Sequence, residues 1–206
     1  RPLLAVLLLA ALAAPAEAQW TNRYPAIPDY SHHIYLEGFE LPTTSAGITD
    51  PAPSPNGRQL AFASKGWLWV MDLEPRRARR VTSGAEVDAR PAWSPDSRQL
   101  AFVRDDSRET WIVVLNLETN EEKIASSEPG LELDPTWMPD GRALVFTAAT
   151  DTGLDLHSVE LATGERTRLT EFEGLMLAPT VLPDGYALIP IAKAFTDEIR
   201  QLDLRT

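Results

Sequence analysis

Hydrophobic residues along this chain form short runs separated by turn residues, and the same order of runs recurs in successive segments. One kind of run is apolar at nearly every position and begins at Leu60, Leu100 and Leu144. Runs of roughly four to eight apolar residues predict strands that are buried on both faces. A second kind alternates more and begins at Trp67, Trp111 and Asp155, which predicts another strand in each segment.

Two further runs complete each segment. A short apolar stretch comes first, and a polar, charged stretch comes last: ARRVT from Ala78, EEKIA from Glu121 and TRLT from Thr167. Charged residues on a strand discourage pairing with another molecule, so these last stretches are expected to be outer edge strands. Each segment therefore predicts four strands.

The segments repeat with a fixed period. Each opens on a proline, at Pro51, Pro91, Pro135 and Pro179, so the period is 40 to 44 residues. A period of about 40 to 45 residues with four strands per unit is typical of β-propeller blades. A β-sandwich would show turns without this longer period, and no segment after residue 20 carries a helical stripe. The predicted fold is all-β: an incomplete β-propeller of about three and a half four-stranded blades.

The boundaries follow from the repeat. We expect the partial propeller to span residues 50–206, with units starting near residues 50, 90, 134 and 178. The fourth unit departs from the others, because Val181 replaces the tryptophan of earlier units and Pro190 aligns with Phe62, Phe102 and Phe146. Proline cannot donate to a sheet ladder, so this strand should be weakened or bulged there. No fourth strand follows before Thr206, which suggests a chain truncated at its end.

The turn within each unit has a recognisable chemistry. Proline sets φ, Asp or Asn caps the turn through its side chain, and Gly accepts a positive φ, although Ser97 stands in the glycine position of the second unit. Trp93 and Trp137 share one repeat position just before this turn, which predicts a role in core packing. Ser54 and Ser94 are expected to form hydrogen bonds within the turns.

The first 18 residues predict a secretory signal peptide. An apolar run from Leu3 to Ala14 is too short to span a bilayer, and Ala16-Glu17-Ala18 has the form of a cleavage site. A buried helix is the alternative, but the run lacks caps and a one-sided stripe. The protein is therefore expected to be periplasmic or secreted, without a membrane span after cleavage. Residues 19–49 are aromatic and proline-rich, which indicates a lead-in segment packed on the propeller.

The net charge bears on the kinds of binding partner, and the cysteine content bears on what stabilises the fold. The net charge is −11, which disfavours binding to nucleic acid, and the chain has no cysteine, so packing rather than disulfides must hold it. The basic cluster from Arg76 to Arg80 is expected to be a solvated hairpin and edge strand.

The usual catalytic patterns are missing. His32 and His33 would point to opposite sides of a strand, and they and His157 are expected to be surface or lead-in histidines. No G-x-S-x-G elbow occurs, and the acidic pairs Asp105-Asp106 and Asp151 with Asp155 are expected to form turns rather than a calcium loop. We therefore predict no catalytic, cofactor-binding or metal-binding residue in these 206 residues.

Two tryptophans are candidates for partner contact. Trp67 and Trp111 open equivalent strands, and either could reach the surface of the ring and stack against a protein or peptide; burial in the core is the alternative.

The pattern P-x-W-S-P-D-G-x-x-L-x-F, seen around Trp93 and Trp137, resembles the TolB-type propeller repeat over about residues 48–204. The stretch from His32 to Asp72 resembles the propeller entry of secreted proteins that continue into a metal-dependent amidohydrolase barrel. That resemblance implies a non-catalytic scaffold or gate in a larger hydrolase, with any divalent metal in a C-terminal part and with another domain of the chain as partner. The alternative is a stand-alone TolB-like periplasmic propeller that binds proteins.

Overall fold

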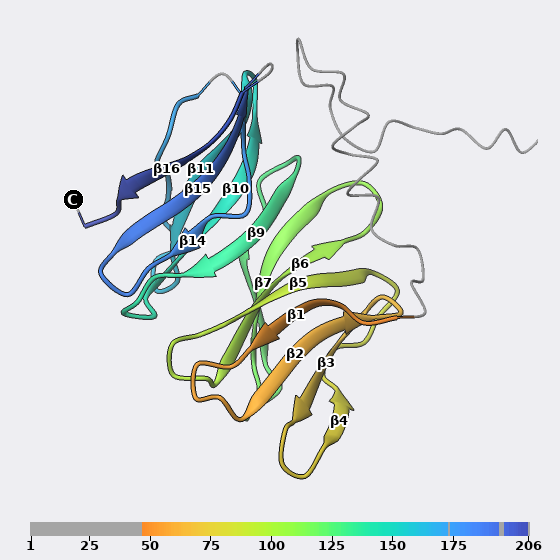
Figure 1. Ribbon diagram of the computed structural model, residues 1–206. Helices are drawn as coiled ribbons and strands as arrows, with labels where there is room; N and C mark the ends of the chain where they lie inside the picture. Colours follow the sequence, from red (N-terminus) through yellow and green to blue (C-terminus); the bar gives the residue numbers. More distant parts are fainter. Residues whose placement is uncertain (1–46, 173, 194–195, 206) are drawn as a thin grey trace, which may run out of the picture.

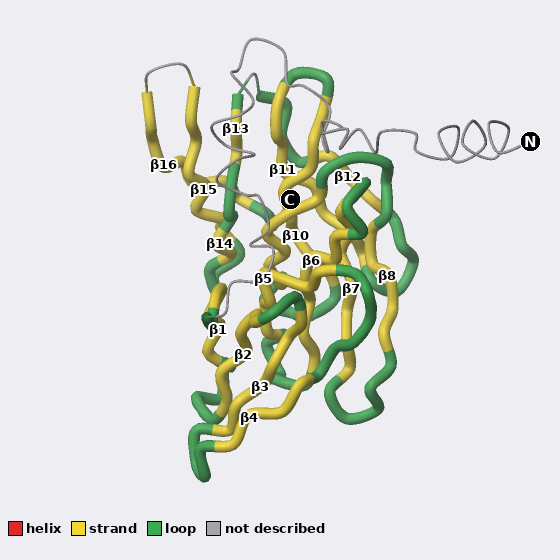
Figure 2. The backbone as a smooth tube through the Cα atoms, turned by 90° about the vertical axis from the view of Figure 1, so that its right-hand side faces the viewer, coloured by secondary structure: helices red, strands yellow, loops and turns green. Residues whose placement is uncertain are grey.

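The computed structural model describes residues 47–172, 174–193 and 196–205, and these residues form strands and turns without a helix (Figures 1 and 2). Blade 1 contains β1 (Thr49–Pro53), β2 (Gln59–Ser64), β3 (Trp67–Asp72) and β4 (Arg77–Arg80). Blade 2 contains β5 (Val87–Trp93), β6 (Gln99–Asp105), β7 (Thr110–Asn116) and β8 (Glu122–Ser126). Blade 3 contains β9 (Glu132–Trp137), β10 (Ala143–Thr150), β11 (Gly153–Glu160) and β12 (Arg166–Arg168).

Blade 4 contains β13 (Leu175–Met176), β14 (Thr180–Val181), β15 (Tyr186–Lys193) and β16 (Thr196–Asp203). The short strands β13 and β14 both pair with β15, and together they take the place of the first strand of blade 4. With β15 and β16, this blade has three strands in the described residues. Blades 1 and 2 are separate antiparallel sheets, whereas one parallel pair, Leu154 with Leu175, joins blades 3 and 4. The fold is therefore all-β, an incomplete propeller as predicted, while the predicted signal peptide and most of the predicted lead-in lie outside the described residues.

The blades are held together by apolar side chains that pack between neighbouring sheets. Between blades 1 and 2, Ala63 and Leu68 pack against Phe102, Val113 and Leu115. A larger cluster fills the space between blades 2 and 3; its central members are Ala101, Val103, Ile112, Leu144 and Phe146. Because Leu100 and Ala101 point to opposite neighbours and are both fully buried, the runs predicted to be buried on both faces are confirmed.

The repeated tryptophans link each blade to the one before it. Trp93 Nε1 donates to the carbonyl oxygen of Ala52 at 2.9 Å, and Trp137 Nε1 donates to that of Ala92 at 3.0 Å. Both indoles are buried, so the predicted core role is confirmed and includes a hydrogen bond between blades. Val181 takes this position in blade 4 and cannot donate such a bond.

The turns follow the predicted chemistry. The Asp96 carboxylate accepts from Arg98 N at 3.0 Å, and Ser94 Oγ donates to it at 2.6 Å while accepting from Gln99 N. Ser97 has a φ of 61°, a left-handed conformation that favours glycine. Its hydroxyl accepts from Asn56 N of blade 1 at 3.1 Å, so this departure from the repeat supplies a contact between blades.

The prediction that Pro190 would weaken or bulge its strand is confirmed on one side of β15, where the first strand is split into β13 and β14 opposite Pro190, and is wrong on the side that faces β16. In blade 3, Trp137 pairs with Leu144, but in blade 4 Val181 pairs with Ala187, one residue earlier than the sequence alignment implies. A slip of one residue exchanges the two faces of a strand. Ile189 therefore packs against blade 3, Pro190 is exposed, and β15 pairs continuously with β16.

We expect two substitutions at Ser97 to differ in stability. Ser97→Ala keeps the left-handed φ and removes the hydrogen bond, so the free energy of unfolding should fall by about 0.5–1 kcal/mol. Ser97→Gly removes the same bond but relieves the backbone, so it should be about 1 kcal/mol more stable than Ser97→Ala. Urea denaturation measures both values. Equal stability of the two variants would contradict the assigned strain.

Candidate functional site

The residue before each leading proline lies at the inner edge of its blade in a left-handed conformation. These residues are Asp50, Arg90, Asp134 and Ala178, with φ between 43° and 54°. The first three contact the next blade: Asp50 accepts from Arg90 N at 3.4 Å, the Arg90 guanidinium pairs with Asp134, and Asp134 accepts from Ala178 N at 3.0 Å. The charges at this inner edge therefore connect successive blades.

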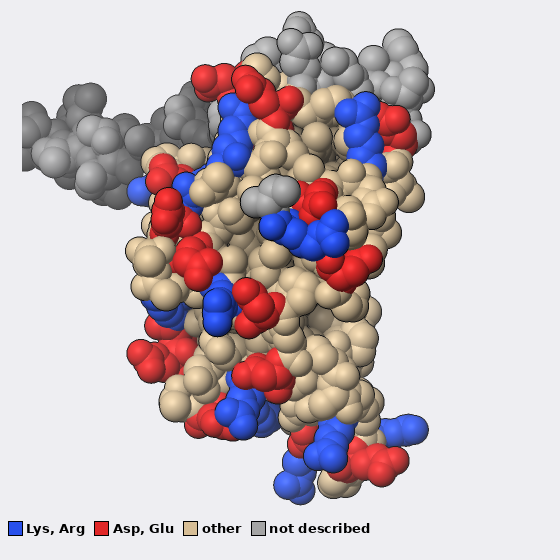
Figure 3. Space-filling view, turned by 90° about the vertical axis from the view of Figure 1, so that its left-hand side faces the viewer, with Lys and Arg blue, Asp and Glu red and all other residues tan. Residues whose placement is uncertain are grey.

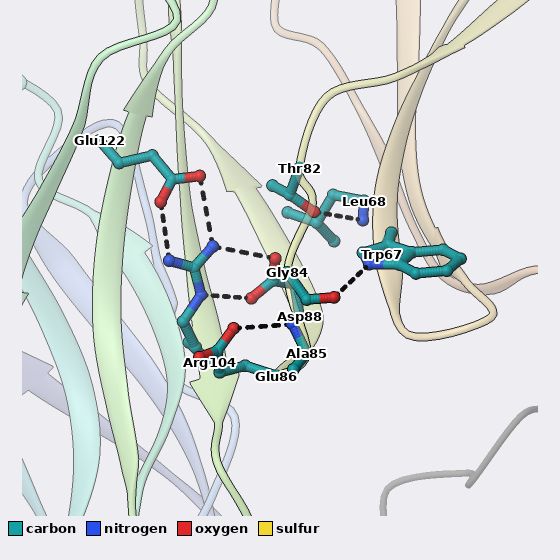
Figure 4. Close-up of polar contacts among 9 residues, drawn as sticks. All are labelled: Trp67, Leu68, Thr82, Gly84, Ala85, Glu86, Asp88, Arg104 and Glu122. Carbon is teal, nitrogen blue, oxygen red and sulfur yellow. Dashed lines mark hydrogen bonds and ion pairs between the residues drawn. The ribbon is translucent and has the colours of Figure 1, made fainter.

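A second polar cluster lies on the side of blade 2 that faces blade 1. The Arg104 guanidinium of β6 lies between two carboxylates, buried Asp88 of β5 and exposed Glu122 of β8 (Figure 4). Arg104 Nε is 2.7 Å from Asp88 Oδ1, and one terminal nitrogen of the guanidinium is 2.7 Å from Glu122 Oε2. The same guanidinium lies 5.3 Å from the ring centre of Phe102, so it combines ion pairing with stacking.

Blade 3 repeats this arrangement with the charges redistributed. Arg166 of β12 takes the repeat position of Glu122, and its guanidinium lies 5.2 Å from the ring centre of Phe146, the equivalent of Phe102. One of its terminal nitrogens donates to Glu132 Oε1 at 2.6 Å, and Glu132 takes the position of Asp88. Each of the two blades thus places a guanidinium over the phenyl ring at one repeat position, but the arginine comes from a different strand in each.

These clusters have the electrostatics of structural ion pairs. Burial raises the pKa of Asp88 and of Glu132, although Arg104 and Ser126, respectively, oppose that shift through hydrogen bonds. Hydrogen bonding to Asp88 raises the pKa of Arg104. Because Asp88 and Glu132 are at most 2% exposed, a substrate cannot reach them without separating the blades. The Arg104 cluster thus joins three strands of blade 2, and the Arg166 cluster joins blade 3 to blade 2, because Arg166 also donates to Ser126 Oγ at 3.3 Å.

Two expectations about individual residues are wrong. His157 is a buried residue of β11, where its Nδ1 accepts from Arg166 Nε at 3.1 Å, and burial lowers its pKa to about 4. Asp155 is fully buried in β11 rather than in a turn, and its carboxylate accepts from Arg168, Thr170 and Phe172 N. Both lie in β11, where apolar and polar residues alternate and the polar positions face a neighbouring blade. The pattern of one strand does not reveal that its polar face is buried.

The other polar residues have the predicted roles in turns and edges. Asp106 accepts from Arg108 N and Glu109 N and so forms a turn, and β4 of the basic cluster is exposed along its length. Among residues 47–172, 174–193 and 196–205, no three His, Asp or Glu side chains gather as metal ligands would. The same residues include no helix long and apolar enough to cross a membrane.

An open groove of about 690 Å³ lies between the outer parts of blades 2 and 3. Charged side chains of both signs line it, including Glu121, Lys123, Arg142 and Glu160. Lys123 Nζ donates across the groove to the carbonyl oxygen of Leu161 at 2.6 Å, so its charge is already engaged. Mixed charge also covers the face in Figure 3, where Lys and Arg lie beside Asp and Glu.

Trp67 and Trp111 occupy equivalent positions in different surroundings. Trp111 is half-buried and packs against the cluster between blades 1 and 2. Trp67 lies on the opposite face of blade 1, where Arg80 lies 4.8 Å from its ring centre and its Nε1 donates to Gly84 O at 3.3 Å. That face also carries Leu60, Trp69 and Met71, which are half-buried, around buried Phe62. We call it the free face of blade 1, because no other described blade packs on it.

These observations define a protein of the propeller class whose buried polar groups join strands within blades and blades to one another. A family model described as the TolB beta propeller domain matches residues 68–193, more than half of the chain, and the chain belongs to that family. The TolB crystal structure from Acinetobacter baumannii superposes with a TM-score of 0.70 at 21% identity, covering 78% of this chain and 42% of that one.

Two curated relatives match shorter stretches. A protein of Sulfurisphaera tokodaii named Tricorn-like protease N-terminal subunit is 42% identical over 51 residues, 25% of this chain and 26% of its own length. The Tol-Pal system protein TolB of Alcanivorax borkumensis is 27% identical over 90 residues, 40% of this chain and 21% of its own length. The match thus spans about a quarter of each relative.

We expect His157 to titrate far below an ordinary histidine. Its folded-state pKa of about 4 lies below the usual 6.5, so the unfolded chain binds a proton first as the pH falls. As the pH falls from about 6.5 to 4, protonation of this histidine in the unfolded chain therefore lowers the free energy of unfolding. Above pH 6.5 the histidine has no such effect. Proton NMR of the imidazole, assigned with His157→Asn, should give a midpoint near pH 4; a midpoint near 6.5 would contradict its burial.

Removing Arg166 should leave Glu132 buried without its ion partner. We expect Arg166→Ala to lower the free energy of unfolding by about 3 kcal/mol, because an unpaired buried carboxylate is costly. Adding Glu132→Gln should restore part of that loss, since the neutral amide needs no counter-charge. Chemical denaturation of both variants at pH 7 tests this. A double variant less stable than Arg166→Ala would show that the pair does not act as described.

Proposed function

We propose that these blades are the non-catalytic propeller of a larger secreted or periplasmic hydrolase of the metal-dependent amidohydrolase class, and that they serve as its scaffold or gate. The observation that carries the proposal is the free face of blade 1, with half-buried Trp67, Trp69 and Met71. Apolar faces of this kind mark contact with further protein. The polar clusters of the described residues are engaged in contacts within blades and between them, which leaves scaffolding as the function they support best.

Two further observations support a hydrolase. The similarity to a protease N-terminal subunit, 42% identity over 51 residues, associates the repeat with hydrolytic proteins. The features of residues 1–18 that predict a signal peptide support secretion or a periplasmic location. Any catalytic metal is expected in a further domain of the protein, which would be the partner of the propeller.

A stand-alone protein-binding propeller is the second candidate. The family match and the similarity to proteins named TolB favour it. Such a propeller would contact a protein or peptide partner, and the half-buried ring of Trp67 beside Arg80 is a suitable contact. The two candidates differ in what the complete source gene encodes, because only a hydrolase requires a catalytic domain.

We expect the 206-residue chain to hydrolyse no amide substrate above a protein-free blank, with or without added zinc. The full reading frame from the source should hydrolyse such substrates, and a chelator should remove that activity. Colorimetric assays with a panel of amide and dipeptide substrates measure both. Activity of the 206-residue chain that a substitution within it abolishes would overturn the scaffold role. A full reading frame that ends without a metal-binding domain would favour the second candidate.

A further inference from the structure

The fourth strands of blades 1, 2 and 3 end in the same way. An apolar residue lies ten positions before the next leading proline, and a hydroxyl residue lies nine positions before it. These pairs are Val81-Thr82 before Pro91, Ala125-Ser126 before Pro135 and Leu169-Thr170 before Pro179. The distance is constant even though the blades differ in length, so it describes how one blade leads into the next.

Both residues of the pair have a defined task. In blades 1 and 3 the hydroxyl fastens the end of the fourth strand to the third, since Thr82 Oγ1 accepts from Leu68 N at 2.9 Å and Thr170 Oγ1 from Leu156 N at 3.0 Å. In blade 2, Ser126 Oγ donates instead to Glu132 Oε1 of the following blade at 2.6 Å. The apolar residue packs into the interface with the following blade. Val81 joins the cluster that also holds Trp111, and Ala125 and Leu169 pack against the clusters beside blades 3 and 4.

The same distance counted back from Pro51 falls in the lead-in segment. Leu41 lies ten positions before Pro51 and Pro42 lies nine positions before it, at the end of residues 38–42, GFELP. The apolar residue of the pair is therefore retained, while proline replaces the hydroxyl that would fasten the strand. Blade 1 is the following blade for this segment, and the free face of blade 1 is the side on which a preceding blade would pack.

We propose that residues 38–42 dock on the free face of blade 1 as the outer strand of a preceding blade, with Leu41 against Trp67. Trp67 takes the repeat position of Trp111, and Leu41 takes that of Val81. Val81 and Trp111 pack against one apolar cluster between blades 1 and 2, and the proposed contact repeats that arrangement. The proposal rests on the repeat and not on the proposed hydrolase, so either can fail without the other.

Charge supports the same occupant. Residues 36–42 contain Glu37 and Glu40 and no basic residue. Beside the free face, Arg80 lies over Trp67, and the exposed strand β4 carries two further arginines. An acidic segment next to this basic strand gains favourable long-range attraction, whereas a second basic surface would be repelled.

A double-mutant cycle in the 206-residue chain tests the contact. Leu41→Ala should lower the thermal midpoint by about 3–6 °C, as expected for losing a partly buried leucine in a chain of this size. In a Trp67→Ala background the same change should lower it by less than about 1 °C, because the partner is already absent. Thr44→Ala, three residues away and outside the pair, should leave the midpoint unchanged.

A second measurement remains informative if these variants fold poorly. Leu41→Asp should increase iodide quenching of tryptophan fluorescence, and the increase should disappear in a Trp67→Phe background. An unchanged midpoint in Leu41→Ala, or effects that simply add, would overturn the proposal. So would a Trp67 that becomes quenchable only on dilution, with light scattering showing a dimer, since a second copy would then cover the face.

Discussion

Packing between neighbouring sheets is the constraint on which this structure depends. A blade here carries apolar side chains on both faces, so neither face can be buried by the blade alone. Leu100 and Ala101 are adjacent in β6, and each is fully buried, one toward blade 1 and the other toward blade 3. Each blade therefore has an apolar face for each of two neighbours, and a blade with one neighbour keeps an apolar face available for further protein.

The polar groups act within the same interfaces. The tryptophan indoles donate to the preceding blade, Asp134 accepts from the following blade, and guanidinium groups stack over Phe102 and Phe146. Buried carboxylates with raised pKa values often indicate catalysis, but here each lies beside an arginine inside an interface. The chemistry of these residues is thus directed at holding blades in place, which agrees with a scaffold whose functional contacts lie on its free surfaces.

The period of the sequence predicted most of the architecture. Strand order, turn chemistry and the buried role of Trp93 and Trp137 all follow from residues that recur at matching positions. The features that escaped prediction depend on contacts between blades. Arg104 and Arg166 reach the same place from different strands, so no repeat position reveals their equivalence, and buried His157 looks polar in its own strand.

The register of blade 4 illustrates a different difficulty. Its sequence aligns with blade 3 without a gap, yet its turn closes one residue earlier, with Leu182 N donating to Tyr186 O where Met138 N donates to Ala143 O. A shift of one residue turns Ile189 inward and Pro190 outward. Packing decides such a shift, because it exchanges a proline for an isoleucine in the interface, and sequence alignment alone does not weigh that gain.

Hydrogen exchange of the tryptophan indoles tests most directly whether the blades are locked together in this way. Trp93 and Trp137 Nε1–H donate inside the interfaces, whereas Trp67 Nε1–H donates at the exposed free face. Nitrogen-edited NMR spectra recorded after transfer to heavy water should show slow exchange for Trp93 and Trp137 and fast exchange for Trp67. Fast exchange of Trp93 and Trp137, at the rate of Trp67, would contradict the account, because the interfaces would then open as freely as the surface.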